Sequence, residues 1–349
     1  GTGRLNVSQA ARAGFVLDET YADYLAADPV QGGDPKGLNI PSLAKENSVN
    51  TTSWKRTLTS TVNTSWTATV NNPPGVSLSV NPSNFALAAG GTQQVTISAN
   101  SSSAALNTWL FGSVVFTPAG GGAVAARFPV ALNRVVSTIP DSLRYNDVRK
   151  SSFAIEKNLE AIPITNLTVS RNGLTPATVY EANLYQDPTP SEPYDGNWAS
   201  DDPANKDGLW VQQITVPAGS KRLVTEIVAT DSPDIDLYLY RWTGSWELLC
   251  ISASYESSEY CSVIDPPPGD YYAWVQTWAA SDPSGTTPDN VELAAAVVPG
   301  ASTGNLTVSL ANGGSSVPAG QPFDLKLSWN LTGPETHWYG RFGLGTDAG

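Results

Sequence analysis

The chain has 349 residues, enough for two or three domains, because single hydrophobic cores rarely grow beyond roughly 250 to 300 residues. Its 19 Lys and Arg against 32 Asp and Glu give a net charge of -13, so an anionic nucleic acid would be repelled. No apolar run approaches the roughly 18 residues that cross a bilayer. We therefore expect no nucleic-acid partner and no membrane insertion. Since no leader peptide precedes the first residue, we also expect a piece of a longer precursor.

The first 30 residues predict two short helices. In the first, Ser8 caps "QAARAG" and Gly14 ends it. In the second, Thr20 and Asp23 have the spacing of a capping box, and the apolar face consists of Tyr21, Tyr24 and Leu25. Two such short helices cannot bury these faces against each other, so we expect them to pack on a larger body.

From about residue 38 the hydrophobic period changes to two, which predicts a mainly β protein of consecutive β-sandwiches. Residues 38–135 read as a sandwich of about seven short strands, with inward positions that include Val95, Ile97 and Ala99. A second sandwich is expected over 136–298. Its strongest strands are "KRLVTEIVAT", "DIDLYLYRW", "WELLCISA" and "DYYAWVQTW". The strands over 299–349 make about half of a third sandwich.

Cys250 and Cys261 lie 11 positions apart on two predicted strands joined by a polar turn. A disulfide between them would stabilise the fold by about 2 to 3 kcal/mol and would imply an oxidising compartment. The alternative is two buried free thiols, since cysteine is often a small core residue.

Hydrolytic signatures are absent from the sequence. It contains one histidine, His337, and no G-x-S-x-G, H-E-x-x-H or C-x-x-C pattern. Because a nucleophile needs a base and a group that orients that base, we expect no catalysis by this chain alone.

The opening residues resemble the part of subtilisin-like serine proteases (subtilases) that follows the helix of the catalytic serine. Five ordered elements carry this resemblance: Gly1, Gly3 and Asn6; Ala10 and Ala11; Gly14 to Asp18; Asp23 and Tyr24; and Leu38-Asn39-Ile40-Pro41-Ser42. The resemblance continues through "KRTLTSTV", "NNPPGVSLSVNP" and "FGSVVF", which look like the family's fibronectin type III-like domain. It implies that residues 1–37 are the helical tail of a protease domain and 38–135 the accessory sandwich. The family's catalytic triad would lie upstream of Gly1.

Residues 205–298 resemble the bacterial pre-peptidase C-terminal domain, through "DIDLYLYRW" and "PPPGDYYAWVQTW". This resemblance implies a jelly-roll-like sandwich. Residues 136–204 have no match in that domain. We thus expect a non-catalytic accessory region of a secreted bacterial endopeptidase, with the upstream catalytic domain and protein substrate as partners. An independent extracellular adhesion or glycan-binding module is the alternative.

Aromatic side chains gather on one face of two predicted strands of this second sandwich. Strand alternation places Leu237 and Leu239 on the opposite face, where they can serve the core. If the aromatic face is exposed, it is a candidate substrate-binding surface; otherwise a loop or a neighbouring domain covers the rings. The candidates are Tyr238, Tyr240, Trp242, Tyr272, Trp274 and Trp278.

Asp231, Asp234 and Asp236, with Asp201 and Asp202, could supply oxygen ligands to calcium. Their spacing is not that of an EF-hand loop. In an acidic extracellular protein such residues are more often simply solvated. Calcium is the one cofactor that the sequence suggests.

Overall fold

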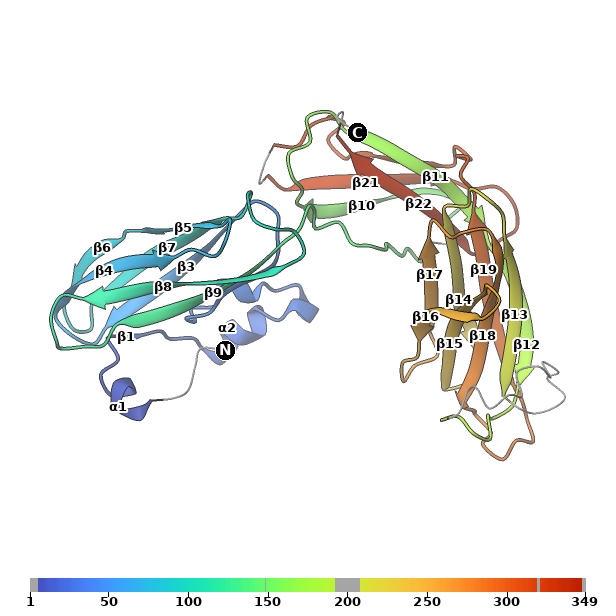
Figure 1. The fold of residues 1–349 in the computed structure, drawn as a ribbon, viewed down its shortest axis with the longest axis horizontal. Coiled ribbons are helices and arrows are strands. Elements are labelled where there is room, and N and C mark those ends of the chain that lie inside the picture. The colour runs from blue at the N-terminus through green and yellow to red at the C-terminus, as the bar shows by residue number, and fades with distance from the viewer. Residues whose placement is uncertain (1–5, 148, 192–207, 319–320, 347–349) are drawn as a thin grey trace. The chain divides into compact units, whose positions relative to one another are not determined.

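The computed structural model describes residues 6–147, 149–191, 208–318 and 321–346 (Figure 1). The chain divides into two compact units, which are described separately. Unit 1 contains residues 1–143, 157–166 and 315–324, and unit 2 contains 144–156, 167–314 and 325–349. The fold is mainly β, as predicted.

Unit 1 contains a β-sandwich of two sheets, the first sandwich. The first sheet has the order β1 (Phe15–Val16), β3 (Thr51–Ser60), β7 (Thr92–Asn100) and β5 (Ser77–Asn81). The second has the order β2 (Leu43–Ser48), β9 (Ala126–Arg134), β8 (Trp109–Pro118), β4 (Thr64–Asn71) and β6 (Asn84–Leu87). Neighbours are antiparallel except for the parallel pair of β2 and β9. The core contains the predicted Val95, Ile97 and Ala99, together with Trp54, Trp66 and Phe116.

The helices before this sandwich are α1 (Val7–Ala10) and α2 (Tyr21–Ala26), followed by the 3-10 turns η1 (Pro29–Gln31) and η2 (Pro35–Gly37). The predicted capping box at α2 is confirmed, because Thr20 and Asp23 each bond the other's backbone N–H. The predicted Ser8 cap of the first helix is wrong. Asn6 caps α1 by accepting from the Gln9 N–H, which starts the helix one residue before Ser8.

The larger part of unit 2 is a sandwich of two four-stranded antiparallel sheets. One sheet has the order β12 (Thr178–Leu184), β19 (Asp289–Val298), β14 (Arg222–Thr230) and β17 (Tyr260–Ile264). The other has the order β13 (Leu209–Val216), β18 (Gly269–Ala279), β15 (Asp234–Trp242) and β16 (Trp246–Ser252). Leu237 and Leu239 are fully buried between the sheets, as the alternation predicts.

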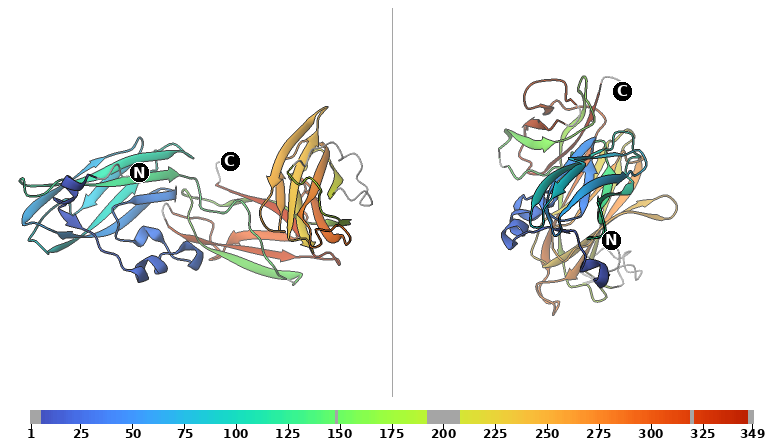
Figure 2. Two further views of the ribbon diagram at one scale, coloured as in Figure 1. Left: turned by 90° about the horizontal axis from the view of Figure 1, so that it is seen from below. Right: turned by 90° about the vertical axis from the view of Figure 1, so that its left-hand side faces the viewer.

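Five further strands join segments that are distant in the sequence. One sheet has the order β10 (Ser151–Leu159), β21 (Phe323–Asn330) and β20 (Leu306–Leu310), and the other pairs β11 (Thr168–Pro176) with β22 (Trp338–Gly345). Figures 1 and 2 show the green β10 and β11 beside the red β21 and β22. The division expected at residue 298 therefore does not separate the sheets. Strands from residues 136–204, which have no match in the pre-peptidase domain, pair in these two sheets with strands from residues 299–349.

A buried carboxylate and a half-buried arginine on β14 join this strand to β22 within unit 2. Glu226 on β14 is buried; it accepts from the Tyr339 hydroxyl at 2.6 Å and pairs with Arg144 at 2.7 Å. Burial, followed by the bond to Glu226, raises the pKa of the Tyr339 phenol. Arg222 donates to the Gly340 carbonyl at 2.7 Å. These contacts hold β22 against β14, an inner strand of the larger sandwich.

Candidate functional site

The segment before the first sandwich is anchored in the core of that sandwich. The short strand β1 pairs with β3, with Phe15 opposite Ser60. The Phe15 ring is buried and lies 4.0 Å from the Trp66 ring, centre to centre. Gly14 passes so close to Trp66 that a Cβ atom would come within 2.2 Å of the indole. The start of this segment is therefore a structural part of the sandwich.

The helix that follows leaves its apolar face uncovered. Tyr21 is 78% exposed, and Tyr24 and Leu25 are each about half exposed. No residue of α2 is buried. The N-terminal segment is thus fixed at Phe15 in the core of the first sandwich, whereas the apolar face of its helix α2 is exposed to solvent.

The aromatic face of the second sandwich is largely covered. Tyr238, Tyr240 and Trp274 are buried, whereas Tyr272 is half-buried. Trp242 and Trp278 keep 48% and 38% of their surface exposed. Three of the six candidate binding residues are therefore covered by other side chains. Tyr238, Tyr240 and Trp274 act as packing residues in this conformation.

Trp246, which was not among the predicted site residues, lies at the centre of this cluster. Its ring contacts those of Tyr240, Tyr272 and Trp274 and packs edge-to-face on Trp242 at 4.9 Å. The Trp242–Trp246 pair closes the hairpin between β15 and β16. The sequence offered a signal for this residue: if "DIDLYLYRW" and "WELLCIS" form a hairpin, Trp246 stands opposite Trp242 and therefore lies on the same face as the predicted aromatic residues.

The exposed part of this face lies along the edge strand β16 and at the end of its hairpin partner β15. Besides Trp242, it includes Leu248 and Ile251, which are 42% and 55% exposed. These side chains stand opposite Tyr240 and Tyr238 on β15. The surface that a ligand can reach is therefore an aromatic and aliphatic strip, and we call Trp242, Leu248 and Ile251 the β16 strip.

A buried polar network continues the same face. The Tyr238 hydroxyl lies 3.0 Å from Asp236 Oδ2 and 3.2 Å from Gln276 Oε1. Gln276 Nε2 donates to Asp187 Oδ2 at 2.6 Å. Burial is the main reason why the pKa of Asp236 is raised to about 6; the bond from Tyr238 lowers it, and the negative charges of Asp234 and Glu259 add to the rise.

The predicted calcium ligands do not come together as a metal site. Within the described residues, no three Asp, Glu, His or Cys side chains are arranged to hold a metal ion. Asp231 is exposed, whereas Asp236 is buried against Tyr238. Asp201 and Asp202 lie outside the described residues. The calcium hypothesis therefore has no geometric support from the part of the chain that is described.

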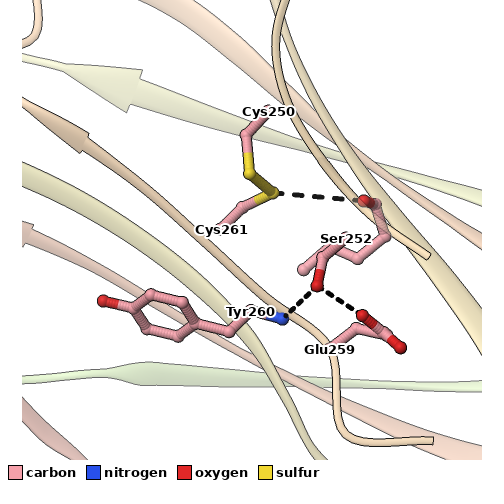
Figure 3. The surroundings of a disulfide bond; sticks show 6 residues. Cys250, Ser252, Glu259, Tyr260 and Cys261 are labelled. Carbon is pink, nitrogen blue, oxygen red and sulfur yellow. Dashed lines mark hydrogen bonds between the residues drawn. A yellow bond between two sulfur atoms is a disulfide. The ribbon is translucent and has the colours of Figure 1, made fainter. Parts of the chain in front are cut away.

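Cys250 and Cys261 form the predicted disulfide, and their Cα atoms lie 5.8 Å apart (Figure 3). The two cysteines belong to different sheets, because β16 and β17 are edge strands of opposite layers. Beside the disulfide, Ser252 accepts from the Tyr260 N–H at 3.1 Å and bonds the buried Glu259. The cross-link thus ties the two layers together at the edge next to the β16 strip. Such a bond is typical of oxidising, extracellular compartments.

His337 is half-exposed, and its Nδ1 lies 3.0 Å from the Thr336 hydroxyl. In the described part of the chain, no helix is long and apolar enough to span a membrane.

Comparison with known families adds a finding for the first sandwich. A family model described as "Fibronectin type-III domain" matches residues 37–132. This range contains strands β2 to β8 of the first sandwich in full and β9 except for its last two residues, whereas β1 lies before it. Residues 37–132 are a fibronectin type-III domain. In this fibronectin domain, Phe15 of the preceding segment adds an aromatic ring to the core.

No curated protein matches the chain in sequence. Among solved structures, the secreted serine protease VesC from Vibrio cholerae is 9% identical with a TM-score of 0.22, over 80% of this chain and 54% of VesC. Tripeptidyl peptidase 2 is 9% identical with a TM-score of 0.22, over 80% of this chain and 21% of that chain. The chain thus spans about half the length of VesC, and similarity this weak carries no argument about function.

Proposed function

We propose that this chain is the non-catalytic accessory region of a secreted subtilisin-like serine endopeptidase. In this role it stabilises the catalytic domain and holds protein substrate near it. The proposal combines the motif resemblance of residues 1–42 with the exposed apolar face of α2.

The proposal rests mainly on the exposed apolar face of α2, formed by Tyr21, Tyr24 and Leu25, which we call the α2 face. A six-residue helix is too short to be stable in water by itself, so it needs packing on its apolar side. Here that side, with Tyr21, Tyr24 and Leu25, is exposed, although Phe15 a few residues earlier is held in the fibronectin core. An adjoining catalytic domain would cover this face, and the anchored Phe15 would fix its position relative to the fibronectin domain.

The first test is the reading frame upstream of Gly1. A Gly-Thr-Ser-x-Ala type motif within a few dozen codons supports the protease, whereas a signal peptide directly before Gly1 contradicts it.

The second test uses the complete protease. Changing Tyr24 and Leu25 to Ser should shorten its half-life at elevated temperature, because the catalytic domain loses apolar contacts. The melting temperature of the isolated 349-residue chain should hardly change. Tyr255→Ser, at a site 97% exposed in unit 2, is the matched control. Equal half-lives for the double variant and the control would contradict the proposal.

The β16 strip supports the substrate-holding part of this role. Exposed Trp242, Leu248 and Ile251 form an apolar surface beside a disulfide that restrains its strand. Trp242→Ala should weaken retention of the chain on insoluble casein or gelatin.

The same exposed Trp242 ring favours a second candidate, an independent extracellular adhesion or glycan-binding module, because aromatic rings also pack on sugars. Retention on chitin or cellulose that depends on Trp242, without retention on protein, would favour this candidate.

A further inference from the structure

The outer face of the fibronectin domain carries a regular array of hydroxyl groups at a hollow of about 530 Å³. The strand register aligns the array in two rows across β3, β7 and β5. Neighbours within a row are about 5 Å apart, and the rows are about 7 Å apart along the strands. We call these residues the hydroxyl grid: Thr51, Asn100 and Ser77 in one row, and Ser53, Ser98 and Ser79 in the other.

The hydroxyls of the grid are available for a ligand. None of its five Ser and Thr side chains makes a hydrogen bond to another described residue, and Asn100 uses only its Oδ1, toward the Ser102 N–H at 3.0 Å. Thr52 also lines the hollow; it is only 9% exposed, and its Oγ1 has no hydrogen-bond partner in the described chain. This part of the sheet therefore combines uncommitted hydroxyls, exposed except for that of the half-buried Ser98, with an unsatisfied one beneath them.

Two lysines give the hollow a positive charge. Lys36 and Lys45 line it with one acidic residue, Glu160, although the whole chain carries a net charge of -13. Lys45 forms no ion pair within the described residues. Lys36 forms only a long one, with its Nζ 3.9 Å from Asp34 Oδ2. The buried Arg56 donates to the Lys36 carbonyl at 3.1 Å and so holds the backbone of this lysine in place. The hollow is thus complementary to an anionic ligand.

The lining also indicates what kind of anion would fit. Strand β7 is hydrogen-bonded on both sides and β5 is the edge strand of this sheet. A ligand that lies above the grid, on the face of the sheet, therefore meets side chains rather than the free backbone groups of that edge. The two apolar residues of the lining, Leu78 and Ala99, are buried. A polypeptide would gain little here, because it usually binds through apolar anchors or through a sheet edge. A sugar carries several hydroxyls around one ring and can bond several grid positions at once.

We infer that the hydroxyl grid binds a carboxylated glycan, whose carboxylates meet Lys36 and Lys45 while its hydroxyls bond the Ser and Thr side chains. The site is separate from the β16 strip and from the α2 face. It does not depend on the proposed protease role.

Polygalacturonate is the probe, with fully methyl-esterified pectin as its uncharged counterpart and poly-L-glutamate as an anion without sugar hydroxyls. The full chain should bind polygalacturonate at low salt. It should bind the esterified polymer and poly-L-glutamate at least about tenfold more weakly, since each lacks one of the two kinds of contact. Titration calorimetry measures all three.

Two variants test the residues. Lys45→Gln should weaken polygalacturonate binding and reduce its dependence on salt, and the pair Ser53→Val with Ser98→Val should weaken it about tenfold. The matched control is Thr92→Val, an exposed hydroxyl on β7 outside the hollow. Unchanged melting temperatures identify variants that remain folded. Three results would each overturn the inference: no binding of polygalacturonate, equal binding of poly-L-glutamate, or an equal loss in Thr92→Val.

Discussion

Asn39 completes the edge of strand β3 by pairing its side-chain amide with the backbone of Thr57. Asn39 Nδ2 donates to the Thr57 carbonyl at 2.9 Å, and Asn39 Oδ1 accepts from the Thr57 N–H at 2.8 Å. Two residues further along β3, strand β1 takes over as the partner, with Val16 opposite Thr59. One side chain thus extends the ladder that anchors the N-terminal segment.

Asn39→Ala should lower the free energy of unfolding of the fibronectin domain by about 1 to 3 kcal/mol, because two backbone groups of Thr57 lose their partners. Chemical denaturation followed by tryptophan fluorescence measures this, since Trp54 and Trp66 lie in that core. Gln94→Ala, at an exposed position opposite Thr57 on β7, is the control and should change little. Equal stability of the two variants would contradict the role assigned to Asn39.

Tyr240 and Trp242 differ in burial, and their replacements should differ accordingly. Tyr240→Ala empties a site that is only 6% exposed and should cost about 3 to 5 kcal/mol of unfolding free energy. Trp242→Ala removes a ring that is half exposed and should cost about 1 kcal/mol, the scale of an aromatic pair. Thermal melting followed by near-UV circular dichroism compares them. A Tyr240→Ala variant as stable as Trp242→Ala would mean that the aromatic face is open.

Removing the disulfide by changing Cys250 and Cys261 to Ala should destabilise the second sandwich by about 3 kcal/mol, since the cross-link closes a short loop of the unfolded chain. Urea denaturation of the variant and of the reduced wild-type chain separates this effect from the loss of buried sulfur atoms. The fibronectin domain, which contains no cysteine, serves as an internal reference. An unchanged midpoint for the second sandwich in both samples would be the contrary result.

The buried Asp236 should make unfolding depend on pH. Its pKa is about 6 in the folded chain against 3.8 as a reference, so the folded state keeps a proton that the unfolded state loses over this range. Its contribution to stability is therefore present below about pH 4 and is lost as the pH rises through about 6. Asp236→Asn cannot titrate and should gain roughly 1 to 3 kcal/mol over the wild type between pH 4 and pH 7. Asp231→Asn, at an exposed site, is the control. A difference that does not vary with pH would refute this expectation.

Local patterns predicted the elements that depend on neighbours in the sequence. The alternation of "DIDLYLYRW" correctly placed Leu237 and Leu239 in the core, and the Thr20–Asp23 spacing correctly placed the capping box. Both follow from geometry that repeats within a few residues. The disulfide could also be anticipated, because two cysteines 11 residues apart on adjoining strands are easily brought together.

Only the tertiary structure decided which strands share a sheet and which rings reach solvent. β11 pairs with β22 across more than 160 residues, and a period of two is the same for every possible partner, so alternation could not reveal this pairing. Tyr240 lies on the face that alternation assigned to it, yet it is buried because Trp246 folds over it from the next strand. The sequence of a strand determines which of its side chains share a face, because side chains alternate along it. Whether that face is buried depends on which other segment of the chain packs against it.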